Sequence, residues 1–317
     1  MMNPAQFVAQ VRTEAAKVVW PSRREAGLTT AMDDFFGQPV EAKETLVPPR
    51  PSINRGYAGA KSERLSYSLG LDSPADLFEA FNVGATSADF PELELEGDEY
   101  ADNLWPDPTA VPSFRPGVEA WFAEVGRVAR RMTSIFARAL DMPDDFFEPF
   151  TGHSIDVLRM VNYAVEPGTP IETDQLGMGA HTDYGIVTIL WADPVPGLQI
   201  LDRDGVWHDA QPAPGALLIN VGDLLVRWTN DRWFSSMHRV LPPVDADGLV
   251  VRRRSAAFFH DGNADALIST IDSCRDASGG SAYDDVTVAE HLFQKLNGSR
   301  GLELNEHAEA EAARLAD

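Results

Sequence analysis

The sequence predicts a mainly β fold with flanking helices, of the β-sandwich or jelly-roll kind. Between residues 185 and 228, short apolar runs alternate with tight turns, a rhythm typical of antiparallel all-β domains. Before them, residues 116–140 carry an amphipathic pattern that predicts one long helix. A chain of 317 residues can bury a sizeable core as one large catalytic domain or two small ones.

Residues 47–53 contain three prolines and predict a loop ahead of the long helix. Within residues 116–140 the apolar side chains recur at helical spacing and form a single stripe. Pro116 near the start and Pro143 beyond the end punctuate this helix. The stripe consists of Val118, Trp121, Phe122, Val125, Val128, Met132, Ile135, Phe136 and Leu140.

The strands follow in short order. Residues 185–190 predict a buried strand, residues 194–197 a turn, and residues 198–201 a second strand before the Asp204-Gly205 turn. Residues 216–221 and 224–228 are expected to continue the series as further strands. Residues 303–317, rich in Ala and Glu, predict a terminal helix or a frayed tail.

Charge and composition limit the partners of the chain. The formal net charge is −23 at pH 7, with an acidic cluster at residues 92–102, so neither nucleic acid nor an anionic membrane surface is expected as a partner. No run of 18 apolar residues occurs, so we expect no transmembrane helix. Residues 1–10 lack the regions of a secretory signal, and the single Cys274 cannot form an internal disulfide. We expect a cytoplasmic protein that is monomeric or weakly associating.

His181, Asp183 and His238 form the candidate metal site. Two imidazoles and one carboxylate fill one face of a non-haem Fe(II) and leave the opposite face for a co-substrate and O2. His181 and Asp183 are two residues apart, and on a strand this spacing points both side chains to one side. His238 need only be brought close by the fold. A zinc hydrolase could use the same three ligands, so the set alone leaves two metals open.

With these residues the chain resembles the 2-oxoglutarate/Fe(II) oxygenases of the isopenicillin N synthase-like type. The two histidines lie 57 positions apart (238 minus 181), a spacing typical of that family. The resemblance covers about residues 33–300 and implies a double-stranded β-helix, or jelly-roll, core at about residues 155–262. Its motifs occur in family order: Asn162-Tyr163, residues 181–185, Pro196-Gly197-Leu198-Gln199, Asn220-Val221-Gly222-Asp223, residues 235–239, and Arg253-x-Ser255 leading into Phe258-Phe259.

The resemblance implies three cofactors or co-substrates: Fe(II), 2-oxoglutarate and O2. It implies that the two histidines and Asp183 hold the iron, and that the Arg253 guanidinium anchors the distal carboxylate of 2-oxoglutarate as a bidentate fork. Ser255 would add a hydroxyl donor, and Asn162 is expected at the co-substrate. Arg252 and Arg254 alternate away from Arg253 and are expected to face solvent or acidic neighbours.

Residues that shape the substrate mouth in related enzymes are further candidates: Asn54, Arg55, Tyr57, Phe81, Arg227 and Trp228. Arg227 could pair with a substrate carboxylate, or equally well form a structural ion pair. Three others could line the pocket or fill the barrel: Trp191, Phe258 and His260. The remaining histidines, which stand outside any ligand cluster, are expected to be structural or exposed: His153, His208, His291 and His307.

Residues 1–32 do not follow the family pattern, whose members open with a short strand, a helix and a Gly-Phe-Phe strand. Residues 7–29 instead resemble the cytosolic amphipathic part of the small membrane subunit of the Sec translocase, without the membrane helix that follows it there. We therefore expect an atypical segment at residues 1–32, from a gene fusion or an ordinary helix, and an oxygenase domain at residues 33–317. A foreign segment should form an amphipathic helix that packs poorly on the oxygenase body.

The function expected from the resemblance is the oxidation of a small molecule, by default its hydroxylation, with release of succinate and CO2. Desaturation, ring closure and ethylene formation occur on the same scaffold, and the fold does not choose among them. Two alternatives remain open: an oxidase like isopenicillin N synthase, which uses no 2-oxoglutarate, and a non-catalytic fusion product.

Overall fold

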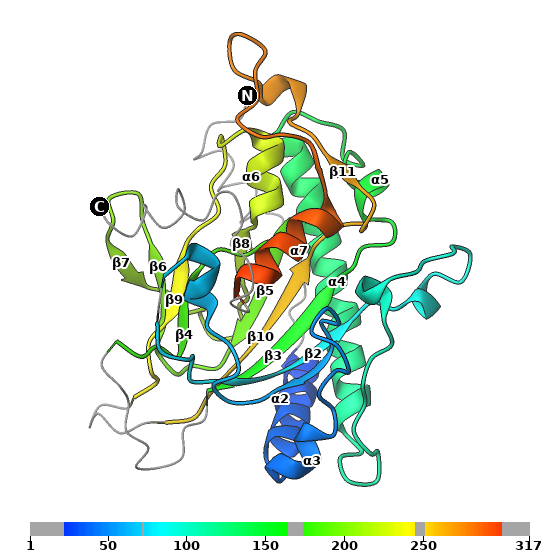
Figure 1. Ribbon diagram of the computed structural model, residues 1–317, viewed down its shortest axis with the longest axis vertical. Coiled ribbons are helices and arrows are strands. Elements are labelled where there is room, and N and C mark those ends of the chain that lie inside the picture. Colours follow the sequence, from blue (N-terminus) through cyan, green and yellow to red (C-terminus); the bar gives the residue numbers. More distant parts are fainter. Residues whose placement is uncertain (1–21, 72, 164–173, 245–250, 300–317) are drawn as a thin grey trace.

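The computed structural model describes residues 22–71, 73–163, 174–244 and 251–299. Two antiparallel sheets dominate it (Figure 1). Residues of both sheets line a cavity. The larger sheet has the order β1 (Gly56–Ala58), β2 (Glu79–Gly84), β3 (Val157–Tyr163), β10 (Arg253–His260), β5 (Val187–Ala192) and β8 (Leu218–Val221). The smaller sheet has the order β4 (Met178–His181), β9 (His238–Val240), β6 (Leu198–Leu201) and β7 (Trp207–Asp209). This architecture confirms the predicted mainly β fold with a jelly-roll core.

The central strand of the larger sheet is β10, which pairs with β3 on one side and with β5 on the other. Its residues alternate between two environments because successive side chains of a strand point to opposite faces. Ala256 and Phe258 are fully buried in the main hydrophobic core. Arg253 and Ser255 face the cavity instead. The strand therefore separates the packed core from the functional side of the sheet.

The predicted long helix is confirmed as α4 (Phe114–Ala139), which packs on the outer face of the larger sheet (Figure 1). Val118, Trp121 and Val125 of its apolar stripe are almost fully buried. Phe122 meets Phe258 of β10 edge to face at a ring-centroid distance of 5.1 Å. On the cavity side lies α7 (Val288–Ser299). A third sheet has two strands, β11 (Leu267–Ile268) and β12 (Val286–Thr287). The short helical segments are α3 (Val40–Glu44), α5 (Glu148–Thr151), η1 (Leu65–Leu69), η2 (Ser87–Asp89), η3 (Asp98–Tyr100) and η4 (Asp272–Cys274).

One strand expectation is wrong. Residues 224–228 belong to the helix α6 (Asp223–Thr229). The run is apolar at nearly every position, and so short a run carries no periodicity that distinguishes a strand from a buried helix. The residues at its ends mark the run as a helix. Gly222 is extended immediately before it, and Asn230 ends it in the left-handed conformation at φ 51°.

The helix α2 (Ser22–Phe36) runs through the expected boundary at residue 33. Its buried side chains Leu28, Met32 and Phe35 join the main core beside α4. Glu25 accepts a hydrogen bond from Trp191 Nε1 at 2.9 Å, and Arg24 forms an ion pair with Glu124. For the described residues 22–29, the expectation of poor packing is therefore wrong, because one stripe at helical spacing faces α4. Residues 7–21 and 303–317 lie outside the described residues, so the other expectations for them stay predictions.

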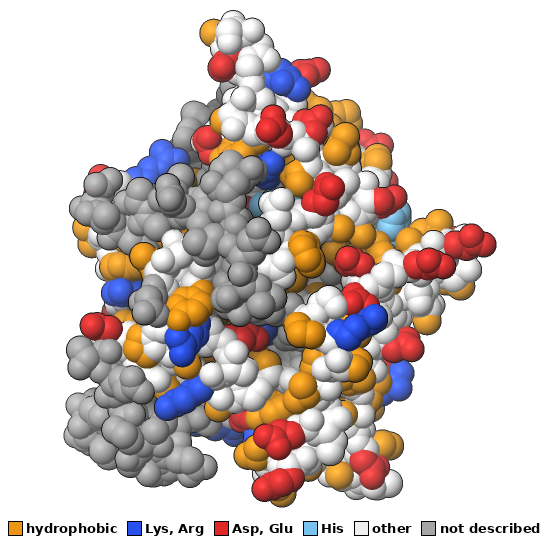
Figure 2. Space-filling model, in the orientation of Figure 1, with side chains coloured by type: hydrophobic (Ala, Val, Ile, Leu, Met, Phe, Trp, Pro, Cys, Tyr) orange, Lys and Arg blue, Asp and Glu red, His pale blue; other side chains and the backbone are white. Residues whose placement is uncertain are grey.

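Within the described residues, no helix is both long enough and apolar enough to cross a membrane. The acidic cluster at residues 92–102 follows β2 and includes η3. Its segment projects from the body of the molecule, and red side chains mark it on the right of Figure 2. The cluster is thus a surface feature that borders the cavity through Asp98 and Glu99.

Candidate functional site

A cavity of about 550 Å³ lies between the two sheets. Strands of both sheets contribute to its wall, and α7 adds apolar side chains from Ala289 to Leu296. Every second residue of β10 and of the segment that follows it lines the cavity: Arg253, Ser255, Ala257, Phe259 and Asp261. The two-residue repeat of a strand therefore presents one continuous row of side chains to a bound molecule.

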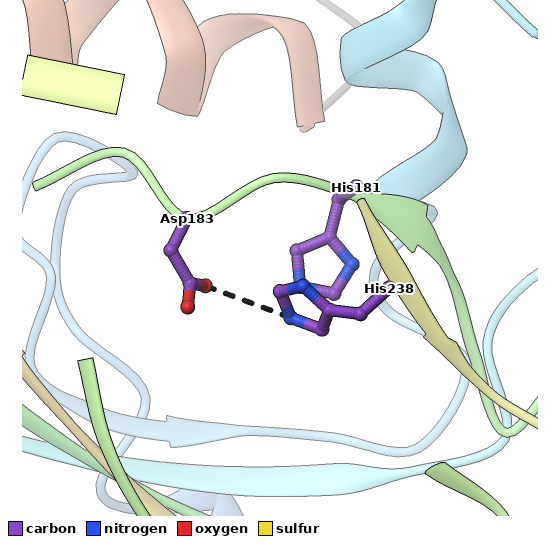
Figure 3. Close-up of side chains that lie close together, drawn as sticks. All are labelled: His181, Asp183 and His238. Atoms are coloured by element: carbon purple, nitrogen blue, oxygen red, sulfur yellow. Dashed lines mark ion pairs between the residues drawn. The ribbon is translucent and has the colours of Figure 1, made fainter. Parts of the chain in front are cut away.

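His181, Asp183 and His238 meet at this cavity. His181 is the last residue of β4 and pairs with His238, the first residue of β9. One potential ligand atom from each of the three residues lies within 4.8 Å of the others. Figure 3 shows the carboxylate of Asp183 directed toward the two rings, with His238 Nε2 at 3.8 Å from Asp183 Oδ1. The structure thus brings together the three residues expected from the sequence, in a cluster that could hold a metal ion.

Hydrogen bonds orient all three side chains. His181 Nδ1 donates to Gly179 O at 2.7 Å and His238 Nδ1 donates to Ser236 O at 3.0 Å, so Nε2 of each ring is free to bind a metal. Asn220 Nδ2 donates to Asp183 Oδ2 at 2.6 Å. Burial, followed by the neighbouring His238, lowers the pKa of His181 to about 4. At neutral pH this ring is therefore uncharged, as metal binding requires.

Asp223 of α6 stabilises the loop that carries Asp183. Its backbone N–H donates to Asp183 O at 2.8 Å, and its carboxylate accepts from Thr182 Oγ1 at 3.0 Å. Lys295 of α7 completes the arrangement with a buried ion pair, 2.9 Å from Nζ to Asp223 Oδ2. Although burial opposes it, the charge of Lys295 lowers the pKa of Asp223. The loop that carries Asp183 is therefore anchored to helices on two sides.

Arg253 lies at the far end of β10 from Asp261, with its guanidinium beside the ring of Tyr163 at 5.0 Å. Its Nε donates to Val195 O at 3.2 Å, whereas its buried Nη1 has no hydrogen-bond partner among the described residues. Ser255 lies beside it on the same face and hydrogen-bonds Tyr163. An unsatisfied guanidinium edge inside a cavity suits a carboxylate, which accepts two parallel N–H bonds.

The structure does not bring Asn162 to the cavity. On β3 the residues Arg159, Val161 and Tyr163 line the cavity, so Asn162 points to the opposite face. There its amide donates to Glu79 Oε1 at 2.8 Å and accepts from Arg252 Nε at 2.6 Å. This placement corrects the expectation of a co-substrate contact.

Only two of the six substrate candidates, Asn54 and Arg55, line the cavity. Tyr57 donates its hydroxyl to buried Glu79 at 2.6 Å. Phe81 packs between Phe35 and Phe114, with ring-centroid distances of 4.6 and 5.1 Å. These two side chains belong to the structural core, which corrects the expectation that they shape the mouth.

The expectation that Arg227 and Trp228 shape the substrate mouth is also corrected. The apolar run that contains them forms the helix α6, which turns both side chains away from the cavity. Arg227 Nη2 donates to Asp284 O at 2.9 Å, and the guanidinium lies over the Tyr283 ring. Trp228 packs edge to face against Phe147 and Phe150 in the core. Neither residue lines the cavity.

The arginines on either side of Arg253, the possible pocket residues and the lone histidines that the structure describes do not line the cavity. Arg252 and Arg254 both form ion pairs with Asp33, which confirms that they face acidic neighbours. Phe258 is core, and Trp191 joins it while bonding α2. His260 lies on the outer face and bonds Asp156 at 2.8 Å. Of the lone histidines, His153 pairs with Asp265, His208 is exposed and His291 is buried with its pKa lowered to about 3 by burial, while His307 lies outside the described residues.

Three residues at the site had no role predicted from the sequence: Asn220, Tyr163 and Asp261. Asn220 orients Asp183, and Tyr163 lies against Arg253. Asp261 could have been found from the alternation that begins at Arg253 and Ser255, because the same parity continues to residue 261. The role of Asn220 could not, because its hydrogen bond joins β8 to the loop after β4, and these segments are distant in the chain.

The jelly-roll core and the His-Asp-His cluster define the class of non-haem iron oxygenases. A family model of the 2OG-Fe(II) oxygenase superfamily matches residues 155–262. The chain is 31% identical over 301 residues to the 2-oxoglutarate-Fe(II) type oxidoreductase hxnY of Emericella nidulans, covering 94% of this chain and 82% of the relative. It is 32% identical to a homoarginine-6-hydroxylase of Oryza sativa subsp. japonica, covering 83% of this chain and 77% of that protein.

Solved structures agree. A full-length Neurospora crassa protein in complex with alpha-KG, which is 2-oxoglutarate, superimposes with a TM-score of 0.75 at 27% identity, covering 88% of this chain and 83% of that one. A 2OG-Fe(II) oxygenase family protein from Caulobacter crescentus gives 0.70 at 31% identity, covering 87% and 85%. The chain belongs to the 2OG-Fe(II) oxygenase superfamily, and it is an oxygenase that uses Fe(II) and 2-oxoglutarate. A separate family model, of the SecE/Sec61-gamma subunits of the protein translocation complex, matches residues 5–32.

Proposed function

We propose that His181, Asp183 and His238 hold Fe(II), and that Arg253 with Ser255 binds the distal carboxylate of 2-oxoglutarate. One observation carries this assignment: a three-ligand cluster and a buried, unsatisfied guanidinium edge face the same cavity. Both fit their groups, since two imidazoles and a carboxylate suit Fe(II), and a planar fork suits a carboxylate. A zinc hydrolase would have no use for the second feature.

The bound iron, 2-oxoglutarate and O2 supply the oxidation, with release of succinate and CO2. The residues of the chain bind and orient: the histidines present Nε2, Asn220 holds the Asp183 carboxylate, and Arg253 fixes the far end of the co-substrate. Hydroxylation is the default outcome for the substrate. The relatives named for proline, homoarginine and validamycin A support a small molecule as substrate.

We further propose the isopenicillin N synthase-like type for this oxygenase, acting as a cytoplasmic monomer. Residues 33–317 would form the oxygenase domain around a core at about residues 155–262. Asn54 and Arg55 remain the candidates for the substrate mouth, because both line the cavity. Residues 1–32 would be a segment acquired by fusion, whose last part has become packed on the body through α2.

The test uses the protein loaded with Fe(II) under anaerobic conditions. Adding 2-oxoglutarate should produce the visible charge-transfer band of a chelated keto acid, and Arg253→Ala should lose it at the same concentration. Removing one partner of a buried charge pair costs about 3–5 kcal/mol, or roughly two to four powers of ten in binding. Fe(II) binding should be nearly unchanged.

Arg254→Ala is the matched control, because it deletes the next guanidinium of the same strand on the opposite face. It should keep the band. If the folded, iron-loaded wild type shows no band and releases no succinate, the assignment is wrong, and an oxidase that needs no 2-oxoglutarate becomes the better reading.

A further inference from the structure

Asp261 is a buried carboxyl that the proposed function leaves unused. It follows β10 directly, is only 6% exposed and lines the cavity. Its carboxylate has no hydrogen bond and no ion pair among the described residues. Burying such a group without a partner is unfavourable, so its presence requires an explanation.

The position of Asp261 relates it to the metal cluster. A Cβ built on Gly185, two residues after Asp183, would lie 2.0 Å from Asp261 Oδ1, so this carboxyl group is packed against the metal-binding loop. The neighbouring Ile186 N–H donates to His260 O at 2.9 Å, which fixes the loop to the end of β10. Arg253 lies at the other end of the same strand. A substrate that approaches the metal from the side opposite the co-substrate anchor therefore meets Asp261.

The positive side chains that line the cavity do not neutralise Asp261. Arg159 pairs with Glu63 at 2.7 Å, and Arg253 is at the far end. Arg55 is near enough to influence the charge of Asp261, but its guanidinium donates to the carbonyls of residues 54, 85 and 99 at 2.9, 2.7 and 2.7 Å. Burial, Asp156 and Asp183 raise the pKa of Asp261 well above its usual value. Among the described residues no cation forms an ion pair with Asp261, and a positive charge placed beside its carboxyl group would oppose this rise in pKa.

The surroundings favour a cation with an apolar body. Of the acidic side chains that border the cavity, Glu63 pairs with Arg159 and Asp98 pairs with Arg50. Glu99 has no ion pair among the described residues, and its negative charge favours a positively charged molecule. Apolar surface from Phe259 and Phe293 lies in the same wall, and Phe293 is 59% exposed. The cavity therefore combines apolar walls with the carboxyl group of Asp261, which has no ion pair among the described residues.

We propose that Asp261 determines substrate specificity by binding the protonated amine of a small organic ammonium substrate whose apolar part rests on Phe259 and Phe293. This inference rests on the proposed function, because it places the substrate opposite the co-substrate anchor. The incoming ammonium group supplies the missing charge partner. It also holds the substrate in a fixed orientation in front of the metal.

The experiment uses the full chain loaded with Fe(II) and 2-oxoglutarate under anaerobic conditions. Calorimetry measures the binding of a panel of matched pairs, each consisting of an amine and its uncharged analogue, such as cyclohexylamine with cyclohexanol and phenethylamine with phenylethanol. The amines should bind and the analogues should not. Succinate release in air should follow the same order among the compounds.

Asp261→Asn should weaken amine binding about thirtyfold or more, the loss expected when one partner of a buried charge pair is removed. Its charge-transfer band with 2-oxoglutarate should be unchanged, which also shows that the variant is folded. Asp261→Ser provides a second, smaller variant. Asp145→Asn, an exposed carboxylate far along the chain, is the control for net charge and should bind amines like the wild type.

The inference is overturned if no amine binds, if the uncharged analogues bind equally well, or if Asp261→Asn binds the amines with unchanged affinity. In these outcomes the band with 2-oxoglutarate persists, so the proposed function stands. Absence of the band in the wild type would instead remove the proposed function. Asp261→Ser tests the same carboxyl group if Asp261→Asn does not fold.

Discussion

Both candidate metal-binding imidazoles are oriented by a hydrogen bond to the carbonyl two residues earlier in the chain. His181 bonds Gly179 O and His238 bonds Ser236 O. In each case the bond fixes the ring and the tautomer, and it leaves Nε2 directed at Asp183. The two short strands β4 and β9 thus present the same local arrangement from opposite directions of the chain. Each histidine ring is therefore oriented by the backbone of its own segment and needs no side chain from elsewhere in the chain.

At this scale we predict the effect of removing one ligand. Asp183→Ala or His238→Ala should abolish most of the activity and strongly weaken Fe(II) binding, because a three-ligand site has no spare protein ligand. Asn220→Ala should weaken Fe(II) binding about 10- to 100-fold, since it removes only an orienting hydrogen bond. Fe(II) titration followed by tryptophan fluorescence measures both. His208→Ala, an exposed histidine, is the control, and wild-type affinity in Asp183→Ala would exclude this site.

Among the elements, β10 and α2 show how one piece of chain serves two purposes. The odd-numbered side chains of β10 line the cavity and the even-numbered ones pack toward the core. The helix α2 covers part of that core while Asp33 pairs with Arg252 and Arg254 at the start of β10. Its packing links the segment that matches SecE to the strand that carries Arg253.

We therefore predict that α2 contributes to global stability. Leu28→Ala and Met32→Ala should each lower the free energy of unfolding by about 2–5 kcal/mol, because both side chains are fully buried. Thr30→Ala, at an exposed position of the same helix, should change it by less than about 0.5 kcal/mol. Urea denaturation followed by circular dichroism measures the difference. Deleting residues 1–30 should also destabilise the protein, and an unchanged midpoint would show that the helix is dispensable.

The whole molecule is held around a cavity to which both sheets contribute. The histidines come from the smaller sheet, Arg253 and Ser255 come from the larger one, and Asp183 lies on the connection between them. A metal held by this cluster, with a co-substrate bound at Arg253 as proposed, would therefore contact both sheets at once. Any ligand that binds only the folded chain stabilises it by mass action.

We predict that Fe(II) and 2-oxoglutarate each raise the melting temperature of the protein and that the two increments add. Anaerobic Fe(II) at about 100 times its Kd should add about 2.7 kcal/mol, and 2-oxoglutarate on the iron-loaded protein should add a similar amount. Arg253→Ala should keep the first increment and lose most of the second, whereas Arg254→Ala should keep both. Differential scanning calorimetry is the measurement. An Arg253→Ala protein that gains the full second increment would contradict the assigned anchor.

Local patterns were enough to predict part of this molecule. The amphipathic stripe of residues 116–140 predicted α4, and the ordered motifs predicted the metal cluster and Arg253. Residue parity on a strand decided one case that failed, and the type of secondary structure decided another. Asn162 belongs to the same motif as Tyr163 but points to the other face of β3, and Trp228 lies on a helix where a strand was expected.

By itself, the sequence predicted the fold class and the His-Asp-His cluster from residue type and spacing, and its resemblance to a known family indicated the cofactor chemistry. Only the tertiary structure decided which residues reach the cavity, since that depends on how strands pair and which face each one turns inward. The packing of α2 across the expected boundary is one such result. Asp261 is another: it is buried, it has no ion pair among the described residues, and it lies beside the loop that carries Asp183, all of which depend on contacts between segments that are distant in the chain.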